Sequence, residues 1–123
     1  MNIKKMKEAV DKLKEDVGEG LLATDIFSAA DGQSIYGHNS NPKACALFNQ
    51  LTNFLMKSLK GSNFPPLGKY YIIDLTDTKM VVVVPMGDFQ WGMLVDTKKT
   101  QTGLLVNVIL PELVQVFQDS LVS

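Results

Sequence analysis

The sequence predicts an α+β fold: a five-stranded antiparallel sheet with helices on both faces, in the order α-β-β-α-β-β-β-α. Three segments repeat apolar residues at helical spacing, and five shorter segments are apolar runs of strand length. The last three strands are joined by Thr76–Thr78 and Met86–Asp88, links short enough for antiparallel hairpins. The chain of 123 residues fits a single domain, 1–123.

The first helix is expected over residues 1–17, as an amphipathic N-terminal extension. Its apolar side chains recur at spacings of 3 and 4 from Ile3 to Val17, and its opposite face is lysine and acid. So narrow an apolar stripe suits a helix that lies in a surface groove or one that pairs with a copy of itself. Gly18 and Gly20 are typical of the end of such a helix.

A hairpin and the middle helix follow. We expect a strand over Leu21–Ser28, a turn at Asp31–Gly32 and a short return strand over Gln33–Tyr36. Asn41 and Pro42 are typical of a helix N-cap and first helical position, and Gly61 of the C-terminal end. The middle helix is therefore expected between Asn41 and Gly61.

The middle helix has one apolar face, which we expect to pack on the sheet. Its members are Ala44, Leu47, Phe48, Leu51, Phe54, Leu55 and Leu59. The opposite face is polar but carries less charge than a fully solvated helix surface normally does. We therefore expect the opposite face to contact another molecule.

The second half of the chain completes the sheet and closes with a helix. Strands are expected over Lys69–Leu75, Lys79–Pro85 and Phe89–Val95, and a helix over about Gly103–Leu121. Pro111 falls on the polar half of that helix, where a kink bends a helix around a core. The run Val81–Val84 is apolar on both faces, so both faces of the sheet are expected to be covered.

The width of the sheet predicts a second copy of the chain. Five strands span roughly 20–24 Å, and one helix covers about 10 Å. The first and last helices can share one face, whereas the middle helix alone is too narrow for the other. A second middle helix from a symmetric partner is the simplest cover, so we expect a homodimer.

The residues that carry chemistry are few and scattered. All 12 basic residues are lysine, which excludes an arginine finger supplied by this chain. His38 lies in a polar loop and Cys45 is the single cysteine, so neither has a partner for nucleophilic, redox or metal chemistry. Asp25 and Asp31 flank the first hairpin and are interpreted as a strand-edge and a turn charge. We predict that the protein is not an enzyme and needs no metal or cofactor.

Charge and hydropathy limit the partners and the compartment. The formal charge of −1 argues against nucleic-acid binding. The longest apolar run, about Met80–Met86, is far shorter than the ~20 residues of a membrane helix. No apolar segment follows the N-terminal lysines, and a lone cysteine fits a reducing compartment. We interpret the chain as complete and cytoplasmic, without membrane insertion.

In this order the segments resemble the roadblock/dynein light-chain domain family. The resemblance rests on LLATDIFSAADGQSIYG, the helix opening at Asn41-Pro42, the strands KYYIIDL, KMVVVVPMGD and FQWGMLVD, and the closing TQTGLLVNVILPEL. It covers about Val17 to Leu121. The additional first helix fits prokaryotic members, among them a regulator of a gliding-motility GTPase.

The resemblance implies a profilin-like sandwich that homodimerises through the middle helix and the third strand. It also implies a non-catalytic regulator or scaffold that binds a Ras-like small GTPase and either modulates GTP hydrolysis or serves as a platform. On this basis Asn53→Glu is expected to split the dimer, because like charges would meet near the two-fold axis. The implied dimer surface comprises Ala46, Asn49, Gln50, Asn53, Met56, Lys57, Lys60, Tyr70 and Ile72.

Two other functions stay open. Profilin-like sandwiches also serve as small-ligand sensors, with a pocket between sheet and helix. A purely structural subunit of a larger complex differs from the regulator only in its partner. The predicted inward positions are almost wholly aliphatic, which indicates a filled core and favours the GTPase-binding regulator over the sensor.

Overall fold

The computed structural model describes residues 2–121. The strands are β1 (Leu21–Ser28), β2 (Ser34–His38), β3 (Tyr71–Leu75), β4 (Lys79–Met86) and β5 (Phe89–Asp96). The helices are α1 (Ile3–Val17), α2 (Pro42–Lys60), α3 (Thr102–Leu104) and α4 (Leu110–Ser120), with shorter helical turns η1 (Gly18–Gly20) and η2 (Leu105–Ile109). Met1, the first residue of the expected helical extension, lies outside the described residues, as do residues 122–123.

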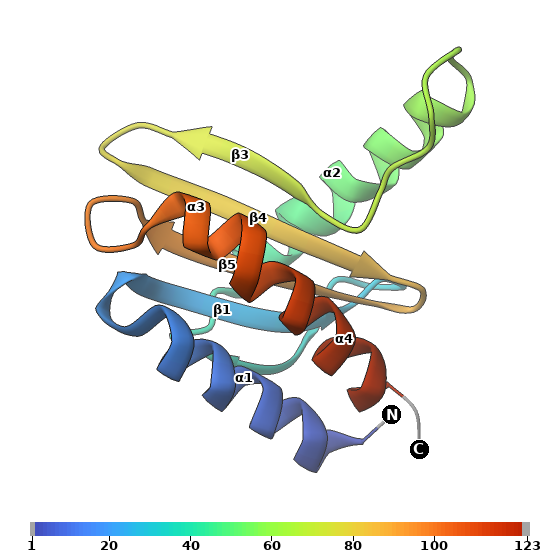
Figure 1. Ribbon diagram of the computed structural model, residues 1–123. Helices are drawn as coiled ribbons and strands as arrows, with labels where there is room; N and C mark the ends of the chain where they lie inside the picture. Colours follow the sequence, from blue (N-terminus) through green and yellow to red (C-terminus); the bar gives the residue numbers. More distant parts are fainter. Residues whose placement is uncertain (1, 122–123) are drawn as a thin grey trace.

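The five strands form one antiparallel sheet in the order β2-β1-β5-β4-β3. Helices α1 and α4 lie on one face of the sheet and α2 on the other (Figure 1). The expected α+β sandwich and its order of elements are therefore confirmed. The sheet has two edges, β2 and β3, and the outer edge of each is unpaired among the described residues.

The main core lies between the sheet and the pair α1 and α4. Trp91 is fully buried there, packs edge-on against Phe117 with 5.5 Å between ring centres, and donates a 2.8 Å hydrogen bond to Thr24 Oγ1. The apolar stripe of α1 is buried in the same core, so α1 lies in a groove of its own chain. The stripe consists of Met6, Ala9, Val10, Leu13 and Val17.

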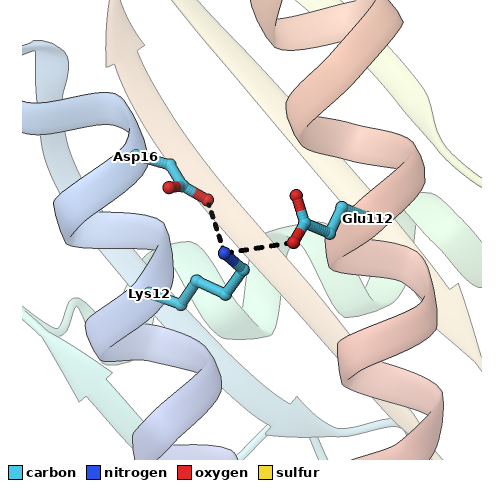
Figure 2. A network of polar contacts seen from close by, with 3 residues as sticks. All are labelled: Lys12, Asp16 and Glu112. Atoms are coloured by element: carbon cyan, nitrogen blue, oxygen red, sulfur yellow. Dashed lines mark ion pairs between the residues drawn. The ribbon is translucent and has the colours of Figure 1, made fainter.

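A surface ion network joins the two helices of this face. Lys12 Nζ on α1 lies 3.5 Å from Asp16 and 3.1 Å from Glu112 on α4 (Figure 2). The hydrogen bond to Glu112 and the charge of Asp16 raise the pKa of Lys12. Because the lysine is solvent-exposed, the network orients the two helices more than it stabilises them.

The C-terminal helix contains a wider turn than the sequence indicates. The predicted single helix is divided into α3, the π-helical turn η2 and α4. Pro111 has no N–H to donate, and its ring crowds the carbonyl of Asn107. The π turn widens the backbone just before this position, and the N–H of Leu110 bonds to Leu105 O. The kink expected at Pro111 therefore takes the form of a π turn.

The four-valine strand is buried within one chain. On the α2 face of the sheet Val81 is 5% exposed and Val83 is 0% exposed. The expectation that a second copy is needed to bury this strand is therefore wrong. The exposed large apolar side chains include Leu47, Phe54 and Met56 on α2 and Ile72 and Leu75 on β3.

Candidate interaction surface

Polar and small side chains of α2 face the sheet. Cys45, Asn49 and Thr52 are its buried residues, and their spacing marks one stripe of the helix. Asn49 Oδ1 accepts a 2.8 Å hydrogen bond from Gln90 Nε2, and the hydroxyls of Thr52 and Tyr71 are 2.6 Å apart. The expectation that Asn49 lies on the outer face of the helix is wrong, because its amide pairs with a buried glutamine of β5.

The apolar side chains of α2 are turned aside from the sheet. Leu47 is 57% and Phe54 66% exposed, and the remaining apolar residues Ala44, Phe48, Leu51, Leu55 and Leu59 are only half-buried. Successive residues of an α-helix are rotated by about 100°, so the apolar side chains point, on average, roughly a quarter turn around the helix axis from the buried stripe. The expectation that this face packs directly on the sheet is wrong. We call Leu47, Phe48, Leu51, Phe54 and Leu55 the apolar flank of α2.

A buried carboxylate fixes the start of α2. Asp25 on β1 accepts hydrogen bonds from Ser34 Oγ at 2.8 Å and from the Asn41 N–H at 3.0 Å, and also from Ser40 Oγ. A Cβ at Gly37 on β2 would clash with this carboxylate. Asp25 is therefore a structural link between β1, β2 and α2, and its interpretation as a strand-edge charge is wrong.

A groove opens between the apolar flank and the sheet. We call this cavity of about 220 Å³ the Phe48 groove. The polar residues of its lining are Thr24, Asp25 and Asn41, and each side chain makes a hydrogen bond within the chain. The groove therefore presents an apolar surface. Its apolar lining includes Ala23, Ala44, Phe48, Leu75, Val81 and Leu94.

A second groove follows the opposite flank of α2. One cavity of about 250 Å³ lies between the helix and the β4–β5 turn, and another of about 410 Å³ lies between the helix and the loop after it. The two cavities share Met56 and Leu67, so we treat them as one feature, the Met56 groove. Its other residues include Asn53, Lys60, Phe64, Pro66, Pro85, Gly87 and Gln90.

Of the candidate chemical groups, Cys45 lies near Asp25, whereas His38 and Asp31 make only local contacts. The His38 ring approaches the side chain of Asn39 at 3.4 Å, and Asp31 accepts a hydrogen bond from the Gln33 N–H, as a turn aspartate does. Burial, followed by the charge of Asp25, raises the pKa of Cys45 to about 12. Within residues 2–121, no three His, Cys, Asp or Glu side chains come together as a metal site. None of the helices in this part of the chain is long and apolar enough to cross a membrane.

We expect the protein to lose stability in alkaline solution. Burial raises the pKa of both Cys45 and Tyr71. Above the ordinary thiol pKa of 9.0, the unfolded chain releases protons that the folded chain retains, so the free energy of unfolding falls as pH rises. The urea midpoint is expected to drop between pH 8 and pH 10, and to drop less in Cys45→Ala and in Tyr71→Phe. Equal midpoints at the two pH values would contradict this expectation.

The nine residues expected at a dimer surface differ in burial and in the element that carries them. Asn49 is buried, Tyr70 is half-buried just before β3, and Ile72 is exposed on β3. The exposed residues on α2 are Ala46, Gln50, Asn53, Met56, Lys57 and Lys60. Sequence reasoning missed the exposure of the apolar flank. The signal available was the set of Cys45, Asn49 and Thr52, small or hydrogen-bonding residues at helical spacing.

The chain has the fold of roadblock-type domains and profilins. Myxococcus xanthus MglB superposes with a TM-score of 0.78 at 13% identity, over 94% of this chain and 93% of that one. A Roadblock/LC7 domain from Streptomyces avermitilis gives 0.63 at 13% identity, over 95% and 94%. Acanthamoeba castellanii profilin IA gives 0.60 at 15% identity, over 91% and 96%. A scan against protein-family models and a search of curated proteins gave no match. The fold implied by the sequence resemblance is thus confirmed.

Proposed function

We propose that the chain is a non-catalytic homodimeric regulator or scaffold that binds a Ras-like small GTPase. The observation that carries the proposal is the apolar flank of α2, which one copy of the chain leaves uncovered beside an open apolar groove. Large exposed apolar surfaces on soluble proteins mark interaction sites.

In a two-fold symmetric dimer, the Phe48 groove of each copy would receive α2 of the other copy. In Figure 1 the C-terminal part of α2 projects past the sheet on the side of β3. If a two-fold axis passes through the β3 edge, the projecting part of the partner's α2 lies over the sheet of this copy. It reaches the end of the sheet that contains Leu75 and Leu94. The apolar flanks of the two helices then face each other, and each covers the groove of the other copy. This contact is isologous, as a closed dimer requires.

The free edge of the sheet supports the same axis. Within residues 2–121, β3 pairs with β4 on one side only, and its other side presents unpaired backbone groups. Antiparallel pairing of β3 with its symmetry mate would satisfy these groups and join the two sheets. Ile72 and Tyr70, at or beside β3, remain proposed interface residues. On α2 we propose the apolar flank in place of the polar positions that the sequence indicated.

Binding of a GTPase is supported by the fold and by the sequence resemblance, and the composition limits how the chain would act on it. The chain shares its fold with MglB, and the sequence resemblance implies a regulator of that kind. Since the chain has no arginine, it cannot supply an arginine finger. It would act by holding residues of the GTPase itself in place, or as a platform.

The small-ligand sensor has less support. Ligand pockets normally combine apolar walls with a few polar groups that orient the ligand. Among the polar residues that line the Phe48 groove, Thr24 donates to Gly92 O, and Asp25 and Asn41 accept hydrogen bonds from Ser34 and from the Ala44 N–H. An apolar helix therefore suits the groove better than a polar metabolite.

The test is binding to each Ras-like GTPase encoded in the same genome. Calorimetry with the GDP form and with a non-hydrolysable GTP analogue should reveal one GTPase whose affinity differs between the two forms. The purified chain alone is expected not to turn over GTP. Absence of binding to every such GTPase, or robust turnover by the chain alone, would overturn the proposal.

A further inference from the structure

We infer that the Met56 groove is a docking site for an acidic, apolar-anchored segment of a partner protein. The inference concerns the flank of α2 opposite the apolar flank, and it needs only one copy of the chain. Three independent observations carry it: the shape of the groove, the distribution of charge along the chain, and an unpaired acceptor in the groove wall.

The groove is built to receive apolar side chains. Met56 on α2 is 53% exposed and Phe64, in the loop after the helix, is 72% exposed. Both lie in the groove lining, with Leu67 and Pro66 beside them. Concave surfaces lined by Met and aromatic side chains are typical of sites that accept a helix or peptide.

The charged residues of α2 and of the loop after it are all lysine, whereas Asp88 lies in the β4–β5 turn at the other wall of the groove. No Asp or Glu occurs between Asp31 and Asp74, whereas Lys43, Lys57 and Lys60 all lie on α2 within that stretch. Lys60 lines the groove itself. A preference for lysine at helix C-termini accounts for Lys57 and Lys60, but it does not account for the lack of acids along the whole segment.

The local charge also contrasts with the rest of the molecule. The whole chain carries a formal charge of −1, so the other elements together are acidic. A positive surface on a nearly neutral protein attracts and orients an acidic partner.

The wall of the groove contains an acceptor that the described residues do not satisfy. Gln90 is 2% exposed, and its Nε2 donates to Asn49, but its Oε1 has no hydrogen-bond partner among residues 2–121. An unpaired buried acceptor is costly. A donor from an incoming chain, such as a backbone N–H, would satisfy it after a small movement of the side chain. A concave wall with such an acceptor favours a peptide over the surface of a lipid bilayer.

The docking site and the proposed dimer use different surfaces. Phe48 lines one groove and Met56 lines the other, with the buried stripe of Cys45 and Thr52 between them. The Met56 groove is open in a single copy of the chain. The residues Asn53, Met56, Lys57 and Lys60, which the sequence placed at a dimer surface, are here assigned to a partner.

The experiment is a selection from a displayed library of random peptides, each about a dozen residues long, against the purified full chain. Enriched peptides are expected to combine Asp or Glu with Leu or Phe. Their affinity should fall at least about tenfold in the double variant Lys57→Glu/Lys60→Glu. The matched control is Lys98→Glu/Lys99→Glu, which changes the charge equally in an exposed loop and should leave the affinity unchanged. Both variants are checked for unaltered Tm and particle mass.

The position of the peptide is read from backbone amide shifts. An enriched peptide should perturb Met56, Leu67 and Gly87, and leave Leu75 and Val81 unperturbed. The inference is overturned if no peptide is enriched, if basic or neutral peptides dominate, or if the shifts lie in the Phe48 groove. It is also overturned if vesicles containing phosphatidylglycerol bind through Lys57 and Lys60 while peptides do not. Light scattering reports the oligomeric state separately.

Discussion

Leu55→Glu is expected to convert the proposed dimer into monomers, raising its dissociation constant at least about a hundredfold, or ~3 kcal/mol. Leu55 belongs to the apolar flank and is only half-buried in one chain, so the substitution leaves the monomer folded. In the dimer, two carboxylates would be buried against apolar side chains without partners. Analytical ultracentrifugation over a concentration series measures the change.

The matched control is Asn53→Glu, which introduces the same charge two positions earlier on the helix. The sequence alone predicts that this variant splits the dimer. In the structure Asn53 lines the Met56 groove, away from the apolar flank that we propose as the interface. We therefore expect Asn53→Glu to dimerise like the unaltered chain. If Asn53→Glu breaks the dimer and Leu55→Glu preserves it, the interface is not on the apolar flank that we propose.

Asp25→Ala is expected to reduce the free energy of unfolding by about 3 kcal/mol, and Tm by roughly 10 °C. The carboxylate accepts hydrogen bonds from Ser34, Ser40 and the backbone of Asn41. Its removal leaves these donors unpaired in a partly buried position and detaches the start of α2 from the sheet. Thermal and urea unfolding, followed by circular dichroism, measure both quantities.

Asp25→Asn serves as the control for size. The amide fills the same space and keeps one acceptor oxygen, but its NH₂ group faces donors. We expect an intermediate loss of stability. If Asp25→Ala unfolds at the same temperature as the unaltered chain, the link between β1 and α2 is not structural.

The local elements could be read from the sequence because their signals are local. Asn41 Oδ1 accepts from the Ala44 N–H at 3.1 Å, Pro42 is the first residue of α2, and Gly61 follows its last. The turns of the β3–β4 and β4–β5 hairpins are likewise set by residues close together in sequence. Strand number, strand direction and the order of elements follow from such signals, and the structure confirms them.

The rotation of α2 could not be read in the same way. Hydrophobicity alone turns Leu47 and Phe54 toward the sheet, and the structure exposes both. The side chains that decide the rotation are paired over long distances in sequence, Asn49 with Gln90 and Thr52 with Tyr71. A single sequence does not show which residues pair in this way, so the flank that we propose as the interface differs from the face that the sequence indicated.

The most direct test of the dimer is an isotope-filtered NOE experiment on a mixture of labelled and unlabelled chains. Contacts between the two copies are expected to join the methyl groups of Leu51 and Leu55 in one copy to those of Leu75, Val81 and Leu94 in the other. Intermolecular contacts that map to Met56 instead would contradict the account. So would a particle of 13.6 kDa at the same concentration, with the Phe48 groove open to water.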